Sequence, residues 1–307
     1  MYTARILSNR RVCDEHWRIV LGMGSLPTSE PGQFIQLQCR RLSKPEDLDQ
    51  VDWSSQSLPK LHQAELLDTE PLLRRPISIA GRRDVDGGVE LDLIYRVIGA
   101  GTRWLSAAPV GTEVSLMGPL GNGFNVTESK PTCALIGGGV GIPPMIYLAQ
   151  RLVALGRKSV AFCGIRSRRF LPLKTSSVEP CPRGTPGRCT EEFATLGVDS
   201  VIATDDGSFG FHGLVGEAFE IWTDSLRPSS DQLSVYCCGP EAMMRSIADF
   251  CANRGYECYA ALERHMACGV GTCQSCICKI RSQSPQGWDY KLCCTDGPVF
   301  NARDIVW

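Results

Sequence analysis

The first part of the chain contains short apolar stretches separated by Gly and Pro, a pattern typical of β-strands. Several short strands at this spacing indicate an antiparallel barrel. Residues 43–70 are polar and acidic without periodicity, and we interpret them as a surface insertion. The predicted strands occupy residues 11–22, 33–39, 76–80, 89–97 and 112–117.

The pattern changes after residue 131, where apolar strands alternate with helical stretches. This alternation predicts a parallel sheet with helices on its faces. Residues 166–192 are rich in Ser, Pro, Gly and basic side chains, and we interpret them as a second surface insertion. The predicted strands are 133–136, 159–163 and 233–238, and the predicted helices are 143–155 and 241–253.

These patterns divide the chain of 307 residues into three parts. We expect a barrel domain at 1–127, an α/β domain at 128–262 and a cysteine-rich module at 263–307. Because 43% of the residues are hydrophobic, the chain can bury more than one core.

Charge and hydropathy exclude some functions. The net charge is -1 and Lys and Arg form no long run, which argues against a nucleic-acid partner. Residues 1–20 lack the apolar core of a signal peptide, and no stretch approaches the roughly 18 apolar residues that span a membrane. We therefore expect a cytoplasmic protein that works with small molecules and other proteins.

Six of the sixteen cysteines lie between Cys268 and Cys294. The first three follow the spacing C-x4-C-x2-C, which is that of plant-type 2Fe-2S clusters. Iron in such clusters takes thiolate ligands, and Gly269 and Gly271 allow the tight loop that surrounds the cluster. The cysteines at these three positions are Cys268, Cys273 and Cys276.

A structural zinc site is the alternative, because four thiolates also hold zinc. Zinc ribbons use two separated C-x2-C pairs, whereas this chain has one tight three-cysteine loop. We therefore favour iron-sulfur, and a zinc-binding adaptor is the alternative from another functional class.

The fourth ligand is Cys278, Cys293 or Cys294. Cys278 lies two residues beyond Cys276 and would strain a loop that is already closed. Cys293 and Cys294 are adjacent and point to opposite faces if extended, so only one of them reaches the iron. The residues alone leave this choice open.

A second group of motifs suits a flavin. Arg75 offers a bidentate match to a pyrophosphate, Pro76 removes a competing donor, and Ser78 places a small hydroxyl near a ring. Downstream, the aromatic Tyr95 stands beside the cation Arg96. Gly101-Thr102 then allows the backbone to approach a ligand closely where a short helix begins.

A third group suits a nucleotide. A glycine-rich turn at 137–141 joins a predicted strand to a helix that begins with two prolines, which places phosphate-binding N–H groups at a helix start. This turn does not match the pattern G-x-G-x-x-G of the Rossmann fingerprint. A second turn, Cys238-Gly239-Pro240, also follows a predicted strand. Both turns would lie at carboxyl ends of parallel strands, where open α/β sheets bind ligands.

In this order the motifs resemble the ferredoxin-NADP reductase superfamily, and most closely the electron transfer subunits of type B dihydroorotate dehydrogenase. The similarity covers nearly the whole chain apart from the two insertions. The motifs are RPIS at 75–78, IYR at 94–96, GPLGNGF at 118–124, GGGVG at 137–141, TDDGS at 204–208, MACGVGTC at 266–273 and DGPVF at 296–300.

This resemblance implies an FAD-binding barrel, an NAD-binding α/β domain and a C-terminal 2Fe-2S module. It implies cluster ligands Cys268, Cys273, Cys276 and Cys294, because the family's fourth ligand stands two residues before the DGPVF motif. It implies FAD contacts from Arg75, Pro76, Ile77, Ser78, Ile94, Tyr95, Arg96, Gly101 and Thr102, and nucleotide contacts from Gly139, Gly141, Cys238, Gly239 and Pro240.

The resemblance also implies a partner, a catalytic FMN-containing subunit that oxidises dihydroorotate in pyrimidine synthesis, in a heterotetramer. Electrons would pass from this FMN through the cluster and FAD to NAD, and we assign no acid-base catalyst to this chain. The alternatives within the superfamily are the reductase subunit of a cytoplasmic hydrogenase and a ferredoxin-NADP oxidoreductase. The basic residues 166–169 follow a predicted strand near the place of an NADP 2′-phosphate, so the choice between NAD and NADP stays open.

Overall fold

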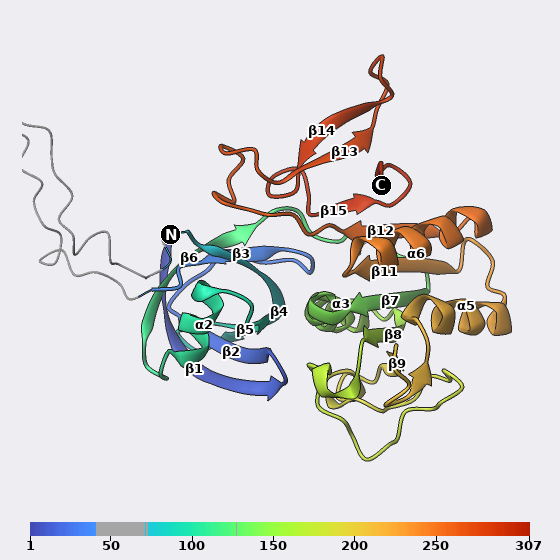
Figure 1. Ribbon diagram of the computed structural model, residues 1–307, viewed down its shortest axis with the longest axis horizontal. Helices are drawn as coiled ribbons and strands as arrows, with labels where there is room; N and C mark the ends of the chain where they lie inside the picture. Colours follow the sequence, from blue (N-terminus) through green and yellow to red (C-terminus); the bar gives the residue numbers. More distant parts are fainter. Residues whose placement is uncertain (41–70, 72, 127) are drawn as a thin grey trace, which may run out of the picture.

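The structure is a computed structural model that describes residues 1–40, 71, 73–126 and 128–307 (Figure 1). The insertion expected at 43–70 lies outside these residues. The described chain forms a closed barrel, a seven-stranded sheet and a C-terminal module that lies over both (Figure 1).

The barrel consists of six antiparallel strands in the order β1-β2-β5-β4-β3-β6. Alternate side chains of these strands fill its interior, as the two-residue period of a strand requires. Helix α2 (Ala100–Ala107) follows β5. The strands are β1 (Tyr2–Cys13), β2 (His16–Met23), β3 (Phe34–Leu37), β4 (Arg75–Val85), β5 (Gly88–Arg96) and β6 (Glu113–Leu120).

The prediction of a single strand at 11–22 is wrong. The chain turns at Asp14 and Glu15, and β1 and β2 pair antiparallel on either side of this turn. Glu15 takes a positive φ of 65°, a conformation that the apolar pattern does not indicate because its flanking residues continue the strand period.

The second domain is built on a sheet with the order β10-β9-β8-β7-β11-β12-β15, parallel except for β15. Helix α3 (Ile142–Ala154) covers one face, and α5 (Val215–Leu226) and α6 (Glu241–Arg254) cover the other. The strands are β7 (Thr132–Gly138), β8 (Lys158–Ile165), β9 (Asp199–Thr204), β10 (Phe211–His212), β11 (Leu233–Cys238), β12 (Glu257–Ala261) and β15 (Val299–Asn301).

The parallel sheet and the flanking helices α3 and α6 confirm the expected α/β class. The segment 166–192, interpreted as a surface loop, is partly built into this domain. Leu171, Leu173 and Cys189 are buried in the core between α3 and the sheet, and Thr190 is fully buried. The short helix α4 (Glu191–Ala194) begins directly after Thr190, at the end of this segment.

The C-terminal module consists of a cysteine-containing loop, the hairpin β13 (Ile277–Arg281) and β14 (Trp288–Leu292), and the edge strand β15. Asn122, just after the last barrel strand, fixes this module to the barrel. Its side chain donates to the carbonyls of Asp296 (3.0 Å) and Val299 (2.9 Å) and accepts from the Val299 amide (2.9 Å). These bonds join the motifs at 118–124 and 296–300.

None of the helices among the described residues has the length and apolar character to cross a membrane.

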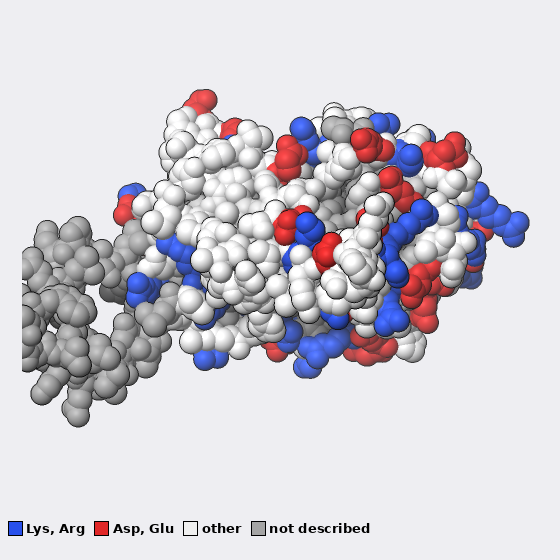
Figure 2. All heavy atoms as spheres, turned by 90° about the horizontal axis from the view of Figure 1, so that it is seen from above, with Lys and Arg blue, Asp and Glu red and all other residues white. Residues whose placement is uncertain are grey.

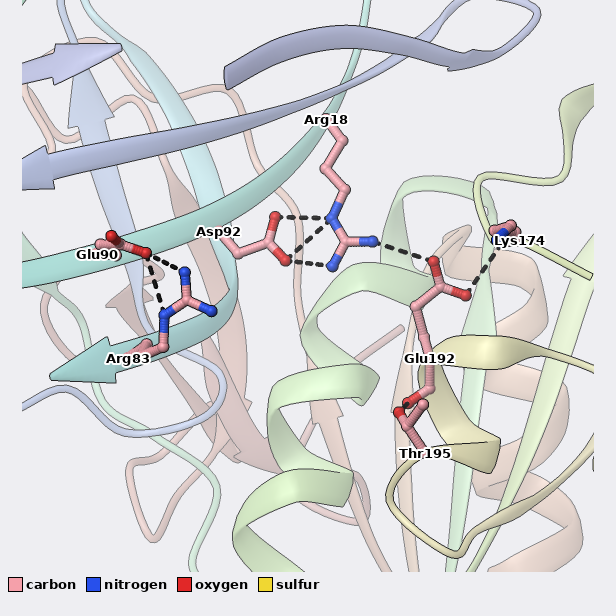
Figure 3. A network of polar contacts seen from close by, with 7 residues as sticks. All are labelled: Arg18, Arg83, Glu90, Asp92, Lys174, Glu192 and Thr195. Atoms are coloured by element: carbon pink, nitrogen blue, oxygen red, sulfur yellow. Dashed lines mark hydrogen bonds and ion pairs between the residues drawn. The ribbon is translucent and has the colours of Figure 1, made fainter. Parts of the chain in front are cut away.

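An ion network connects the barrel to the α/β domain (Figure 3). Arg18 on β2 donates to both carboxylate oxygens of Asp92 on β5, its Nε lying 2.9 and 3.0 Å away. Its Nη1 also donates to Glu192 on α4 at 3.1 Å. Burial raises the pKa of Glu192, so this carboxylate depends on Arg18 and on the Lys174 amide at 3.0 Å for its stabilisation.

Replacing Arg18 by Met is expected to lower the free energy of unfolding by about 2–3 kcal/mol, somewhat less than the loss for a fully buried pair, because two carboxylates lose their common partner. Urea unfolding measures this change. Arg5→Met is the control, because the Arg5–Glu113 pair is exposed and such pairs contribute at most about 1 kcal/mol. Equal effects of the two substitutions would show that the network does not stabilise the domain junction.

Candidate functional site

A cavity of about 530 Å³ lies between the barrel and the carboxyl ends of the parallel strands. Its walls include the loops after β7, β8, β9 and β11, the start of α5, and two barrel residues, His16 and Arg96. Three residues expected at the nucleotide, Gly139, Gly239 and Pro240, line it. Parallel strands place their following loops at one edge, which is why these distant segments meet here.

Gly141 and Cys238, also expected at the nucleotide, lie beneath this wall. A Cβ on Gly141 would stand 2.1 Å from the Cys238 carbonyl oxygen, so only glycine allows the two loops to approach this closely. Cys238 is 2% exposed. Neither residue is among those lining the cavity. Their close contact instead joins the loops after β7 and β11, and other residues of these loops line it.

Several cavity residues carry charge or a free polar atom and escaped the sequence analysis. His16 is 3% exposed, and burial lowers its pKa and so favours the neutral ring. Its Nδ1 contacts the Asp14 carbonyl at 3.0 Å, and its Nε2 has no partner within the described chain. Glu263 and Asp205, the latter within the TDDGS motif, are exposed at the cavity wall, and partial desolvation raises the pKa values of both. No motif surrounds His16 or Glu263, so only the fold reveals them.

The outer face of β4 carries part of the expected flavin site. Ile77 and Ile79 point into the barrel core, so Pro76 and Ser78 point outward. The Arg75 side chain lies against Gly101 of α2, where a Cβ would be 2.9 Å from its Nε. Arg75 donates to the carbonyls of Leu73 (2.7 Å) and Arg74 (3.2 Å). The structure therefore brings a guanidinium to the first turn of a helix.

Other expected flavin residues divide between the two faces of β5. Tyr95 is 3% exposed inside the barrel, and its hydroxyl donates to Asn9 at 3.1 Å. Ile94 points the other way, into the core shared with α3, and Arg96 reaches the cavity beside its ion-pair partner Glu15. Thr102 accepts the Ile98 and Gly99 amides at 3.0 and 3.2 Å and so closes the start of α2.

The cysteine loop presents its thiols in two pairs. The Cys268 sulfur accepts the amides of Val270 and Cys273, each at 3.4 Å. Hydrogen bonds with Ser275, and then with Cys268, lower the pKa of Cys273 to about 6 and favour its thiolate. Burial, followed by a hydrogen bond with Cys276, raises the pKa of Cys294 to about 11. Cys268 thus neighbours Cys273, and Cys276 neighbours Cys294.

Cys278 and Cys293 form a separate pair. Their thiols hydrogen-bond to each other, which is the leading cause of a lowered pKa for Cys278 and a raised pKa for Cys293. Both are buried, at 5% and 0% exposure, between the hairpin and the α6 side of the sheet.

The donor set fits a two-iron cluster, because each iron takes two of the four thiolates and the loop offers two pairs. Backbone amides aimed at the Cys268 sulfur also suit a cluster, since such bonds stabilise thiolate charge. Within the described ranges, no three His, Cys, Asp or Glu side chains come together closely enough to hold a single metal ion.

Comparison with known proteins agrees with this geometry. Residues 263–306 match the family model described as the iron-sulfur cluster binding domain of dihydroorotate dehydrogenase B. The chain is 38% identical to the electron transfer subunit of dihydroorotate dehydrogenase B (NAD(+)) of Bacillus mycoides, over 77% of this chain and 81% of that protein. It is 35% identical to the same subunit of Shouchella clausii, over 91% and 87% of the two chains.

The chain belongs to the family of dihydroorotate dehydrogenase B electron transfer subunits. It therefore is an oxidoreductase component with an iron-sulfur cluster binding domain. Among solved structures, an NADH-dependent reduced ferredoxin-NADP oxidoreductase shares the fold, with a TM-score of 0.70 and 22% identity over 99% of this chain and 90% of that one. Phthalate dioxygenase reductase shares it with a TM-score of 0.54 and 18% identity over 95% and 76%.

Replacing Cys294 by Ser is expected to remove most of the cluster, because it breaks one of the two thiol pairs in the loop. Cys293→Ser, which changes the neighbouring residue in the other thiol pair, is expected to retain it. Iron content, acid-labile sulfide and the paramagnetic signal of the reduced protein measure the difference. Normal cluster content in Cys294→Ser together with its loss in Cys293→Ser would reverse the ligand assignment.

Proposed function

We propose that this chain transfers electrons between NAD(H) in the cavity, FAD on the outer face of the barrel and a 2Fe-2S cluster in the cysteine loop. The observation that carries this proposal is the adjacency of the three places. Arg96 links the barrel to the cavity, and Gly269 of the cysteine loop packs against Gln36 on β3, the strand next to β4.

The FAD site of this proposal uses Arg75 for the pyrophosphate and Ser78 and Pro76 for the ring system. The position of Arg75 beside Gly101 supports it, because a guanidinium and a helix start both favour phosphate. Tyr95 and Ile77 act indirectly, by filling the barrel beneath that face. Bound FAD would connect a two-electron hydride donor with a one-electron cluster.

The nucleotide of this proposal is NAD. Asp205, at the end of β9, lines the cavity and would repel a 2′-phosphate. Of the basic residues at 166–169, Arg168 and Arg169 stack on the rings of Phe209 and Phe170, with centroid distances of 4.2 and 4.7 Å. Arg166 also stacks on Phe170, at 4.9 Å, and it is the residue of this group that lines the cavity with Asp205.

The partner of this proposal is the catalytic subunit that holds FMN, and it docks over the cysteine loop. Val270, between two proposed ligands, is 51% exposed, and Cys273 is exposed as well. Figure 2 views the molecule from the side of the C-terminal module and shows charged side chains gathered over the α/β domain, with mostly uncharged atoms toward the barrel. A surface with few charges beside the cysteine loop suits a subunit interface, because charged residues are depleted at the centre of such interfaces. The heterotetramer and the cytoplasmic location stay predictions.

Arg75→Ala is expected to reduce bound FAD to less than a tenth after gel filtration, because the bidentate contact with a phosphate is lost. The FAD occupancy of Arg75→Lys is expected to lie between those of the wild type and Arg75→Ala, since an ammonium keeps the charge without the planar fork. Flavin absorbance per chain measures occupancy. Arg83→Ala is the control, since Arg83 pairs with Glu90 near the other end of β4. Full FAD occupancy in Arg75→Ala would refute the assignment.

The isolated chain is expected to reduce an artificial dye with NADH but not to oxidise dihydroorotate. The cavity and the FAD site belong to this chain, whereas the proposed dihydroorotate site belongs to the partner. Stopped-flow absorbance of the purified chain, alone and with the partner added, separates the two activities. Dihydroorotate oxidation by the chain alone, at the rate of the complex, would contradict this division.

A further inference from the structure

Gln36 on β3 is a fully buried side chain whose carboxamide has no hydrogen-bond partner in the described chain. The residue is 0% exposed, and neither Nε2 nor Oε1 has a partner. Leaving such a group unpaired costs roughly 1–3 kcal/mol for each unsatisfied atom. Gln33, three residues earlier, shows the usual arrangement: it donates to the Gly121 carbonyl at 2.7 Å and accepts the Glu30 amide at 2.8 Å.

The fold places this amide between two of the proposed cofactor sites. Ile35 and Leu37 point into the barrel core, so Gln36 points outward. Its register partner on β4 is Pro76, on the same outward face as Ser78. Pro76 has no N–H to offer. One side of Gln36 therefore borders the proposed FAD strand.

The other side of Gln36 contacts the cysteine loop. A Cβ on Gly269 would stand 2.6 Å from its Cγ and 2.8 Å from its Nε2, and Gly269 has a φ of +73°. Glycine is thus required at this position both for the backbone conformation and for the close approach of the amide. Gly269 immediately follows Cys268, so the amide lies at the wall of the loop that would enclose the cluster.

We propose that Gln36 donates a hydrogen bond from Nε2 to a sulfur of the iron-sulfur cluster and thereby raises the reduction potential of that cluster. This inference rests on the proposed cluster site. Cluster sulfurs accept hydrogen bonds and donate none, so the NH2 end of the amide faces them. Such a bond stabilises the additional negative charge of the reduced state, which makes reduction more favourable.

The test replaces Gln36 by Met, which keeps the unbranched shape and removes both polar atoms. At a fixed potential, the ratio of reduced to oxidised cluster is expected to fall by about threefold to tenfold; tenfold corresponds to about 59 mV for one electron. Redox titration followed by the paramagnetic signal of the reduced cluster measures this ratio. The thermal midpoint is expected to change little, because losing the bond from Nε2 to the cluster is offset by removing Oε1, which has no partner.

Gln33→Met is the matched control. It removes two satisfied hydrogen bonds, so it is expected to lower the thermal midpoint and to leave the cluster potential unchanged. Gln36→Leu is a second variant without the amide, and it should shift the potential in the same direction if the missing hydrogen bond is the cause. The full-length chain with its partner is used throughout.

The outcomes separate this inference from the proposed function. Wild-type protein without iron and sulfide would refute the cluster site itself. If the wild-type protein holds a cluster and its potential is unchanged in both Gln36→Met and Gln36→Leu, the inference alone is overturned. A shift confined to the flavin potential would also overturn it, because the amide would then contact FAD instead of the cluster.

Discussion

The arrangement of the molecule depends on one helix that is buried on two sides. Helix α3 packs against the sheet through residues such as Leu148 and Leu152, and the same core includes Ala80 and Ile94 from the outer face of the barrel. The Tyr147 hydroxyl donates to the Ser29 carbonyl at 2.6 Å and so fixes the helix to the loop before β3. Since the helix begins at the glycine turn of β7, this shared core sets the distance between the barrel and the sheet loops on the other side of the cavity.

Polar contacts around this core then fix the orientation of the parts. Arg18 connects two barrel strands with α4, and Asn122 holds the chain segment that leads into β15. Apolar packing is not directional, whereas hydrogen bonds and ion pairs specify which groups face each other. The combination allows three candidate cofactor sites to share one junction, which electron transfer between them requires.

Close approach at this junction is obtained by omitting side chains. Gly141 lets two loops of the sheet meet under the cavity, and Gly269 lets the cysteine loop reach the barrel. A larger residue at either position would separate the parts that the proposed function brings together. The glycines therefore contribute through backbone distance, and the polar or sulfur-bearing neighbours supply the chemistry.

The sequence by itself determined the class of the fold and the family, because strand periods, glycine turns and the C-x4-C-x2-C spacing are local properties of the chain. It predicted β11 at its observed bounds because that stretch is apolar, and α6 within one residue because Gly239-Pro240 and Gly255 mark its two ends. It merged β1 and β2, because the turn at Glu15 carries no Gly or Pro to mark it. Its site residues were identified by motif, so it gave no account of Gln36, His16 or Glu263.

Only the tertiary structure decided which side chains meet: it paired Cys276 with Cys294, buried Tyr95 inside the barrel and left Gln36 without a partner. The physical reason is that these contacts join segments far apart in the chain, and their distances follow from how the barrel, the sheet and the module pack, which no local pattern encodes.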